Sequence, residues 1–392
     1  MPHARLAALL PAPPRGTRLA FALIFCHGML AYLSFFFLPI YFKTHLGLSG
    51  REIGIFAAVN NIAAMLFIFP AGLGADAFSP RRMAQVFSLA SALCFLLLPA
   101  LAAFWSLLCV AALWSVSRQS VQLAINSEVF KKSEASQAGR VFGAYNFHGC
   151  MGVGAGMLLG AVLIDRLPFA VVFYVQAAGL LVMAGLSSLL PRTKTVRVEL
   201  LRHARDFRRP AVLFFVLVLC LFSLHWGAEH TAYTLFLREV LGLTGLRMGL
   251  YMVCGLIAMA SSAFVFGLLL QGSRVRAQHV FFIGIALSGL GHMLMTSTNP
   301  WFSVAMRMLH ELGDGAMVVV MYFGIKKMFH VDHIGGSSGL VGLANLVGGF
   351  LGSLAFGAVL QAWGPQMPMI ISGAITLLLI PLVLAGRRFL AQ

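Results

Sequence analysis

The sequence predicts an all-α polytopic membrane protein with twelve transmembrane helices, arranged as two six-helix bundles related by pseudo-two-fold symmetry. The prediction rests on composition, on long apolar runs and on an internal repeat. Of the 392 residues, 60% are hydrophobic and 10% are charged, and the mean hydropathy is +0.90. Soluble domains carry about 25% charged residues. A cytosolic enzyme, a disordered chain and a disulfide scaffold are therefore excluded.

Apolar runs, broken by charges and by Gly or Pro, define the expected spans. Each run is about 20 to 25 residues long, which is the length that crosses a bilayer as a helix. The runs cover residues 19–42, 52–75, 83–103, 105–129, 140–164, 168–190, 211–237, 246–270, 279–298, 301–327, 337–362 and 367–386. The expected domains are an N-terminal segment (1–18), a first bundle (19–190), a basic linker (191–210), a second bundle (211–386) and a tail (387–392).

Lysine and arginine concentrate at both ends of the chain and in alternate loops, above all in the 191–210 linker. The positive-inside rule then places both termini in the cytoplasm, in a protein of the inner membrane. This distribution also explains the net charge of +16, so we expect no nucleic-acid partner. The six cysteines lie inside apolar runs and form no CxxC pair, which gives no sign of a disulfide or a metal centre.

The two halves of the chain resemble each other at a shift of about 195 residues. Gly47-Leu48-Ser49-Gly50 recurs as Gly242-Leu243-Thr244-Gly245, each before the second span of its half. In the fifth span of each half, Gly152 matches Gly348. Parallel six-helix repeats are a known plan of secondary transporters. The glycine rows predict close helix packing by spans 5 and 11.

Residues 72–82, Gly-Leu-Gly-Ala-Asp-Ala-Phe-Ser-Pro-Arg-Arg, resemble the 2–3 loop motif of the major facilitator superfamily, Gly-x-Leu-Ala-Asp-x-x-Gly-x-[Arg/Lys]-[Arg/Lys]. Gly74 and Ser79 depart from that motif. The resemblance implies an alternating-access transporter that is not an enzyme and has no cofactor. It also implies a cytoplasmic gating cluster, made of Asp76, Arg81, Arg82 and Glu128.

Antiporter-type members of that family often carry an Arg in span 4 with Gln and Gly three residues on, and a Gly-Pro pair in span 5. Here Arg118 is followed by Gln119 and Gln122 without a Gly, and span 5 contains no Pro. These departures favour import by symport over export.

Ionisable residues near the bilayer centre are costly, and this makes them functional candidates. In span 10, Arg307, His310, Glu311 and Asp314 follow the spacing of one helix face. Two carboxylates one turn apart in a medium of low dielectric constant are not easily both ionised, so one should hold a proton. Asp314 lies farther from Arg307 and is the expected titrating group. The alternative is a self-neutralising cluster that only holds helices together.

Span 7 carries His225, Glu229 and Tyr233 at intervals of four residues, a pattern that suits proton exchange or metal ligation. In span 4, Arg118 and Gln122 share a face. Arg118 needs an anion, either a substrate carboxylate or phosphate, for which its planar fork is suited, or a fixed acid. The neutral candidates, each of which can also be a simple interhelical hydrogen-bonding group, are His27, Asn60 and Asn146.

We therefore expect a monomeric secondary active transporter that uses protons to move a small polar or carboxylate-bearing organic solute through the lipid bilayer. The expected substrate-binding residues are Arg118, Gln122, His27, Asn60, Asn146, His225, Glu229, Tyr233 and Arg307. The expected proton-coupling residues are Asp314, Glu311, His310 and Glu229. A proton-antiport exporter of drugs or metabolites is the main alternative, ahead of a divalent-metal exporter. A membrane-embedded sensor or a lipid-handling enzyme would belong to a different class. The sequence contains no Walker loop or HExxH motif, and we expect no resident metal.

Overall fold

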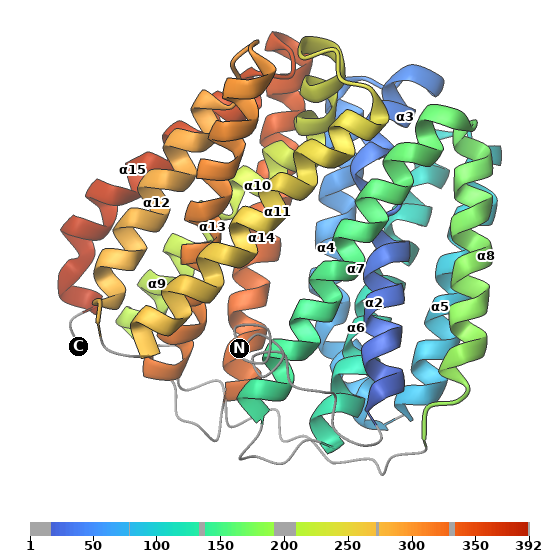
Figure 1. Cartoon of the computed structure of the whole chain (residues 1–392), viewed down its shortest axis with the longest axis horizontal. Coiled ribbons are helices and arrows are strands. Elements are labelled where there is room, and N and C mark those ends of the chain that lie inside the picture. The colour runs from blue at the N-terminus through green and yellow to red at the C-terminus, as the bar shows by residue number, and fades with distance from the viewer. Residues whose placement is uncertain are drawn as a thin grey trace, which may run out of the picture. The chain divides into compact units, whose positions relative to one another are not determined.

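The computed structural model describes residues 17–77, 79–132, 138–191, 209–271, 274–328 and 334–390. Within them the secondary structure is entirely helical, with turns between the helices (Figure 1). The first half contains α2 (Arg18–Tyr32), η1 (Phe35–Phe37), α3 (Leu38–His45), α4 (Gly50–Ala77), α5 (Pro80–Leu97), η2 (Leu98–Ala100), α6 (Phe104–Lys132), α7 (Ala138–Arg166) and α8 (Phe169–Ser187). The second half contains α9 (Pro210–Phe222), α10 (Leu224–Ala228), η4 (Glu229–Tyr233), η5 (Phe236–Val240), α11 (Gly245–Gln271), α12 (Ala277–Leu294), α13 (Pro300–Met328), α14 (Ile334–Trp363) and α15 (Met367–Leu390).

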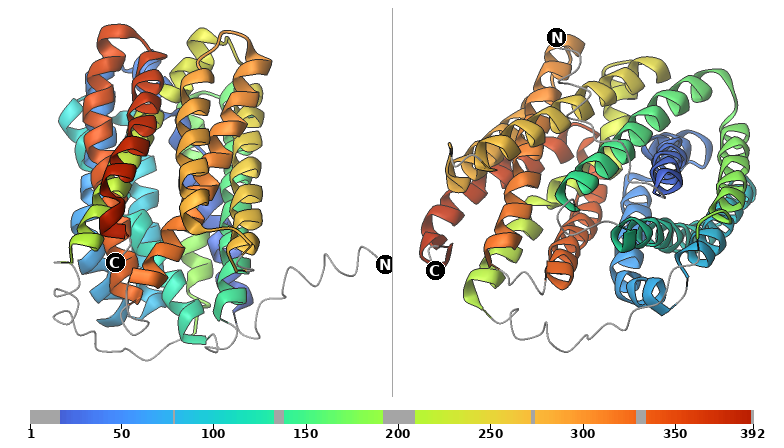
Figure 2. Two further views of the ribbon diagram at one scale, coloured as in Figure 1. Left: turned by 90° about the vertical axis from the view of Figure 1, so that its left-hand side faces the viewer. Right: turned by 60° about the horizontal axis from the view of Figure 1, so that its bottom comes forward.

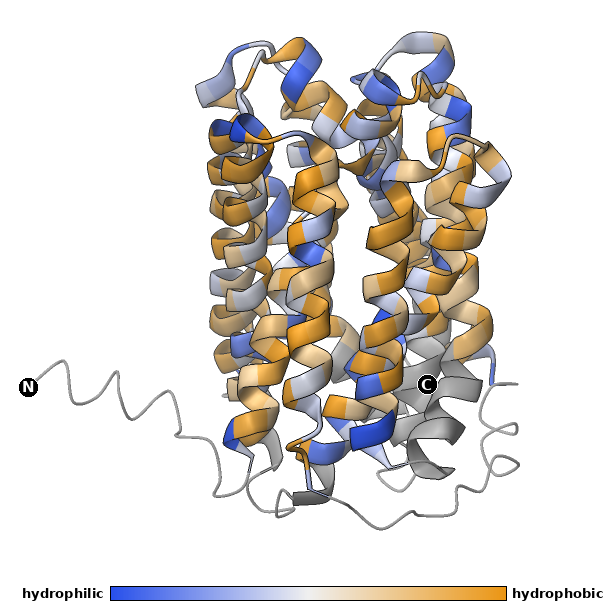
Figure 3. Ribbon diagram, turned by 90° about the vertical axis from the view of Figure 1, so that its right-hand side faces the viewer, coloured by the Kyte–Doolittle hydropathy of each residue, from blue (hydrophilic) through white to orange (hydrophobic). Residues whose placement is uncertain are grey.

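The all-α membrane fold predicted from the sequence is confirmed, and each predicted span coincides with a helical segment. Ten of the described helices are long and apolar enough to cross a membrane. Figure 3 shows apolar residues along the helices and polar residues gathered in the loops. The two expected spans that are not among these ten are the second and the tenth. They correspond to α4 and α13. The middle of α13 carries the charged residues Arg307, Glu311 and Asp314, which lower its hydropathy.

Contacts divide the chain into two compact units. The first unit contains Met1–Phe36 and Leu66–Val198, and the second contains Phe37–Met65 and Glu199–Gln392. Within the first unit α2 packs against α6, α7 and α8, as Figure 2 shows. Within the second unit α13 packs against α11 and α12, while α14 packs against α9 and α10. The bundle boundaries at 19–190 and 211–386 stay predictions.

The first span is interrupted. Helix α2 ends at Tyr32, a 3₁₀ turn follows at Phe35–Phe37, and α3 resumes with Pro39 in its first turn. Proline has no N–H, and its ring clashes with the carbonyl four residues earlier. A continuous helix through Phe35 is therefore disfavoured, and the chain restarts instead.

Close packing by spans 5 and 11 is confirmed, and the partners are spans 1 and 7. A Cβ atom added to Gly152 of α7 would meet the backbone carbonyl of Phe25 in α2. A Cβ atom added to Gly348 of α14 would meet the backbone carbonyl of Cys220 in α9. The same kind of contact thus recurs in both halves at the predicted shift. Glycine at these positions allows the two backbones to approach each other closely.

Candidate functional site

Helix α13 brings the four ionisable residues of span 10 to one buried face in the second unit. Arg307, His310, Glu311 and Asp314 are each at most 8% exposed, as their helical spacing predicts. The neighbouring helices α11 and α12 pack directly against α13. The predicted stripe is therefore enclosed by protein.

Span 7 meets this face with an irregular helix. Nδ1 of His225 lies 2.6 Å from the carbonyl oxygen of Phe222. The N–H of Trp226, which would bond that carbonyl in a regular α-helix, bonds Ser223 instead at 3.2 Å. The helix then widens into a π-helical turn over Glu229–Tyr233. Such turns are frequent at functional sites, and this one carries the Glu229 side chain.

The Arg307 guanidinium joins the two helices. It donates to both carboxylate oxygens of Glu229 and, at 2.5 Å, to Oε1 of Glu311. Its Cζ atom lies 4.4 Å from the centroid of the Tyr233 ring, a cation–π distance. The permanent positive charge is therefore held by two fixed carboxylates and one aromatic ring, leaving only the buried Nε without a hydrogen-bond partner.

The contact between His225 and Asp314 requires a proton. Since the Phe222 carbonyl can only accept, Nδ1 of His225 must donate to it. Nε2 of the same ring is 3.0 Å from Oδ2 of Asp314. A hydrogen bond there requires a proton, either on Nε2 or on the carboxyl group. Trp226 Nε1 also donates to Oδ2, at 3.3 Å.

His310 repeats this arrangement with Glu229. Nδ1 of His310 is 2.9 Å from the carbonyl oxygen of Ser288 in α12, so Nδ1 carries a hydrogen. Nε2 is 3.0 Å from Oε1 of Glu229, and this contact also needs a proton. The Ser288 hydroxyl donates to Oδ1 of Asp314 at 2.7 Å. Ser288 therefore contacts both His310 and the Asp314 carboxylate.

The charges of this cluster account for both protons. The cluster contains three carboxylates, of which Arg307 pairs with Glu229 and Glu311 and His225 pairs with Asp314. With neutral histidines the cluster carries a charge of −2, which is costly in a buried site. One proton in each histidine–carboxylate pair brings the charge to zero. The hydrogen-bond geometry and the charge balance therefore agree.

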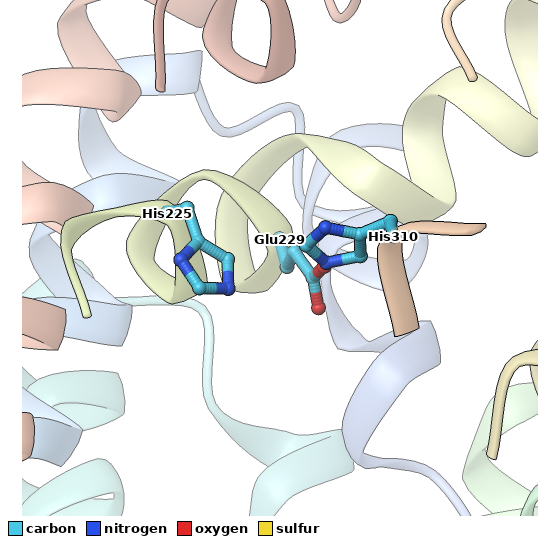
Figure 4. A group of neighbouring side chains, drawn as sticks. All are labelled: His225, Glu229 and His310. Atoms are coloured by element: carbon cyan, nitrogen blue, oxygen red, sulfur yellow. The ribbon is translucent and has the colours of Figure 1, made fainter. Parts of the chain in front are cut away.

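The cluster has the donor types of a metal site. His225, Glu229 and His310 each offer a ligand atom, all within 4.8 Å of one another (Figure 4). However, Arg307 donates to both oxygens of Glu229, and its positive charge disfavours a second cation beside it. The arrangement suits protons better than a divalent ion.

His292 of α12 belongs to this cluster although the sequence analysis missed it. Its ring centroid is 4.5 Å from that of His310 and 5.4 Å from that of His225. The residue is fully buried, and neither ring nitrogen has a hydrogen-bond partner within the part of the chain that the structure describes. The general rule on ionisable residues inside membranes would have found it.

In the first unit, α6 and α7 form a polar group around Gln122. The Tyr145 hydroxyl donates to Oδ1 of Asn126 at 2.6 Å, and Nε2 of Gln122 donates to the same atom at 3.0 Å. Arg118, one turn earlier on α6, forms no ion pair within the described part of the chain, and its buried Nε has no hydrogen-bond partner. His27 of α2 lies near enough for electrostatic interaction with Arg118.

The remaining predicted residues are distributed as follows. Asn60 is buried and lies in the second unit, whereas Asn146 is exposed in the first. Of the predicted gating cluster, the side chain of Asp76 lies outside the described residues. Glu128 is fully buried, and Arg81 and Arg82 lie in the first turn of α5. Neither the substrate-binding nor the gating assignment is tested by these positions, and both stay predictions.

Comparison with known proteins gives one family. A family model described as Major Facilitator Superfamily matches residues 20–274 and 257–389. No curated protein matches the chain in sequence.

Solved structures of the same fold exist. The structure of the nucleoside transporter NupG has a TM-score of 0.81 and 15% identity, covering 95% of this chain and 98% of its own. A bacterial homologue of the human lysosomal transporter Spinster, in an inward-facing and occupied conformation, has a TM-score of 0.78 and 13% identity, covering 98% and 97%. A POT family transporter in complex with a thioalcohol-conjugated peptide has a TM-score of 0.77 and 14% identity, covering 97% of each chain. At these identities the likeness is one of fold.

Proposed function

Because the chain belongs to the Major Facilitator Superfamily, and is thus a multi-pass membrane protein of a family of secondary transporters, we propose that it is proton-coupled. It moves a small polar or carboxylate-bearing organic solute by alternating access, and import by symport is the favoured direction. It resides in the inner membrane as a monomer, with both termini in the cytoplasm.

One observation carries the proton coupling. Two histidine–carboxylate pairs, His225 with Asp314 and His310 with Glu229, each have a hydrogen bond that needs an added proton. Both pairs lie in a buried cluster whose charge is neutral only when the two protons are present. A group that binds protons in a water-poor interior can exchange them when alternating access exposes it to one side and then the other.

Asp314 remains our choice for the titrating carboxylate. Glu229 and Glu311 are bonded by Arg307, whose guanidinium does not lose its proton. Asp314 instead receives bonds from His225, Trp226 and Ser288. None of these three donors carries the permanent positive charge that Arg307 holds beside Glu229 and Glu311. Protonation at Asp314 therefore responds to pH more readily than protonation at Glu229 or Glu311.

The substrate's anionic group is assigned to Arg118, which forms no ion pair with any described acid. The structural neighbours include a transporter of nucleosides and one bound to a modified peptide. Both ligands are small polar organic molecules, the size class proposed for this chain. Asp76, Arg81, Arg82 and Glu128 keep their proposed role in cytoplasmic gating.

The proposal is tested in proteoliposomes with Asp314→Asn. A solute is first identified by a thermal-shift screen of metabolites, drugs and metal ions, because a ligand that binds only the folded state raises the Tm. The wild type should accumulate that solute when a pH gradient is imposed. Asp314→Asn should abolish accumulation but keep exchange of solute between the two sides, because the neutral amide resembles the protonated carboxyl group.

Asp165→Asn, at the end of α7, is the matched control and should behave as the wild type. If Asp314→Asn still accumulates solute in response to the pH gradient, the coupling site lies elsewhere and Glu229 is tested next. Solute that leaves vesicles as protons enter would indicate the antiport exporter instead.

A further inference from the structure

We propose that the first unit binds its substrate as an aromatic carboxylate, with Arg118 holding the carboxylate and Tyr32, Phe35 and Phe36 contacting the ring. This inference rests on the proposed transport function and names the class of substrate. All of these residues lie in the first unit.

At the charged end of the site, Arg118 forms no ion pair with an acid of the described residues. Arg118 is partly buried, and its Nε atom has no hydrogen-bond partner. Glu128 lies ten residues further along the same helix, about 15 Å along its axis at 1.5 Å per residue. Two more buried polar atoms of α2 and α6, Nδ1 of His27 and Oγ of Ser117, have no hydrogen-bond partner among the described residues. Buried polar atoms are rarely left unsatisfied in proteins, so a polar ligand is expected here.

The apolar end of the site is a cluster of aromatic rings at the break in span 1. The ring centroids of Tyr32 and Phe35 are 5.5 Å apart, and those of Tyr32 and Phe36 are 5.6 Å apart. Trp114 of α6 lies 5.5 Å from Phe35. Tyr32, Phe35 and Phe36 are only partly buried, whereas Trp114 is 3% exposed. The three rings therefore retain open surface, and Phe35 contacts the buried indole of Trp114.

Helix α6 connects the two ends of the site. Trp114 and Arg118 are four residues apart and share one helix face, about 6 Å along the axis. Helix α2 packs against α6 and supplies His27 on the charged side and Tyr32 on the aromatic side. A ligand that satisfies both ends has an anionic group joined to a ring by a short chain.

Charge and ring chemistry select among ligands. A neutral solute would leave the Arg118 guanidinium without a counter-ion, and a dianion would leave one negative charge unpaired. Aromatic rings prefer edge-to-face or offset contacts with other aromatic rings, and the pairs Tyr32–Phe35 and Phe35–Phe36 are edge-to-face. A monoanionic aromatic acid meets both requirements.

The test measures binding of three matched probes to the purified full-length protein by titration calorimetry. Phenylacetate has the ring and the charge, phenylacetamide has the ring alone, and cyclohexylacetate has the charge with a non-aromatic ring. Phenylacetate should bind at least about tenfold more tightly than phenylacetamide, as expected for a hydrogen bond to a charged group. It should bind about threefold more tightly than cyclohexylacetate, as expected for an aromatic pair.

Two variants assign these preferences to residues. Arg118→Gln should remove the preference for phenylacetate over phenylacetamide, and Phe35→Leu should remove the preference over cyclohexylacetate. Arg166→Gln and Tyr174→Leu, at exposed positions of α7 and α8, are the matched controls and should keep both preferences. Size-exclusion chromatography of each variant checks that it is folded.

Equal binding of phenylacetate and phenylacetamide, equal binding of phenylacetate and cyclohexylacetate, or no binding of phenylacetate would overturn the inference. The proposed function is judged separately by accumulation of any solute in response to a pH gradient. If phenylacetate binds but no solute accumulates, proton coupling is wrong while the aromatic carboxylate site stands. If another solute accumulates in response to the pH gradient and phenylacetate does not bind, the aromatic carboxylate site is wrong while proton coupling stands.

Discussion

Gly47 and Gly242 adopt the same left-handed backbone conformation, with φ of 64° and 61°, at positions 195 residues apart. The residue that follows each glycine makes the same bond: the Leu48 N–H donates to Phe42 and the Leu243 N–H donates to Leu237, both at 3.0 Å. The repeat seen in the sequence is therefore also a repeat of backbone geometry. Each glycine turns the chain from one span into the next.

The first prediction is that Gly47→Ala destabilises the fold by about 1 kcal/mol, because an L-residue with a side chain is disfavoured in the left-handed region. The space around Gly47 is open, so no steric overlap contributes. Gly185→Ala in α8 also adds a methyl group into open space but within a helix, and it should be neutral or stabilising. Thermal unfolding in detergent measures both. Equal effects of the two substitutions would contradict the role of the left-handed turn.

The spans, the repeat and the stripe of α13 could be predicted from the sequence because each depends on local spacing. Apolar run length gives the spans, and a helix places Arg307, His310 and Asp314 on one face whatever surrounds them. The residues of other helices that contact this face of α13 could not be predicted. Glu229, which bonds Arg307, lies at the start of a π-helical turn, and no residue pattern in span 7 indicates that turn.

The contacts between Asp314 and the neighbouring helices also could not be predicted from the sequence. Its hydrogen bonds to His225 and Ser288 come from two other helices. Likewise the ring cluster around Tyr32 depends on the break after α2. In the sequence the aromatic residues there were indistinguishable from the many that fill cores and face lipid.

The second prediction concerns the ion pairs of Arg307. Arg307→Gln leaves Glu229 and Glu311 without their cation and should destabilise the fold by about 3 to 5 kcal/mol, as breaking a buried ion pair does. The double variant Arg307→Gln/Glu311→Gln removes one of the unpaired carboxylates and should recover part of that loss. Arg247→Gln, at an exposed position in α11, is the control. If the double variant is no more stable than Arg307→Gln, Glu311 is not held by Arg307.

The third prediction is a pH dependence at the start of α4. The N–H and hydroxyl of Ser49 both donate to Oε2 of Glu52 at 2.8 Å, and the Ser49 hydroxyl accepts from the N–H of Glu52 at 3.2 Å. These bonds form a capping box. The Ser49 backbone and side-chain bonds lower the pKa of the Glu52 carboxyl from its ordinary value of 4.5.

Because the pKa of Glu52 is lowered in the folded state, its contribution to stability is present above the unfolded pKa. That contribution is lost as the pH falls through the folded pKa. Glu52→Gln should therefore lower the Tm at about pH 7 and have less effect below about pH 4. Solvent screens this partly exposed group, so the shift will be small. Ser49→Ala should show the same pH dependence. A Tm difference that grows as the pH falls would contradict the assignment.

The last prediction concerns His292, which is buried against His310 with neither ring nitrogen bonded. A buried polar group without a partner lowers stability by about 1 to 3 kcal/mol. His292→Leu replaces the ring with an apolar side chain and should therefore raise the Tm. If His292 exchanges protons with His310 during transport, the same substitution should reduce accumulation driven by a pH gradient. Higher stability together with lower transport is the expected pair of results, because functional sites often retain groups that lower stability.

His279→Leu, at an exposed position in the first turn of the same helix, is the control and should change neither the Tm nor transport. A His292→Leu variant that is more stable and transports normally would show that His292 has no part in coupling. A variant with a lower Tm would show that the ring stabilises the cluster.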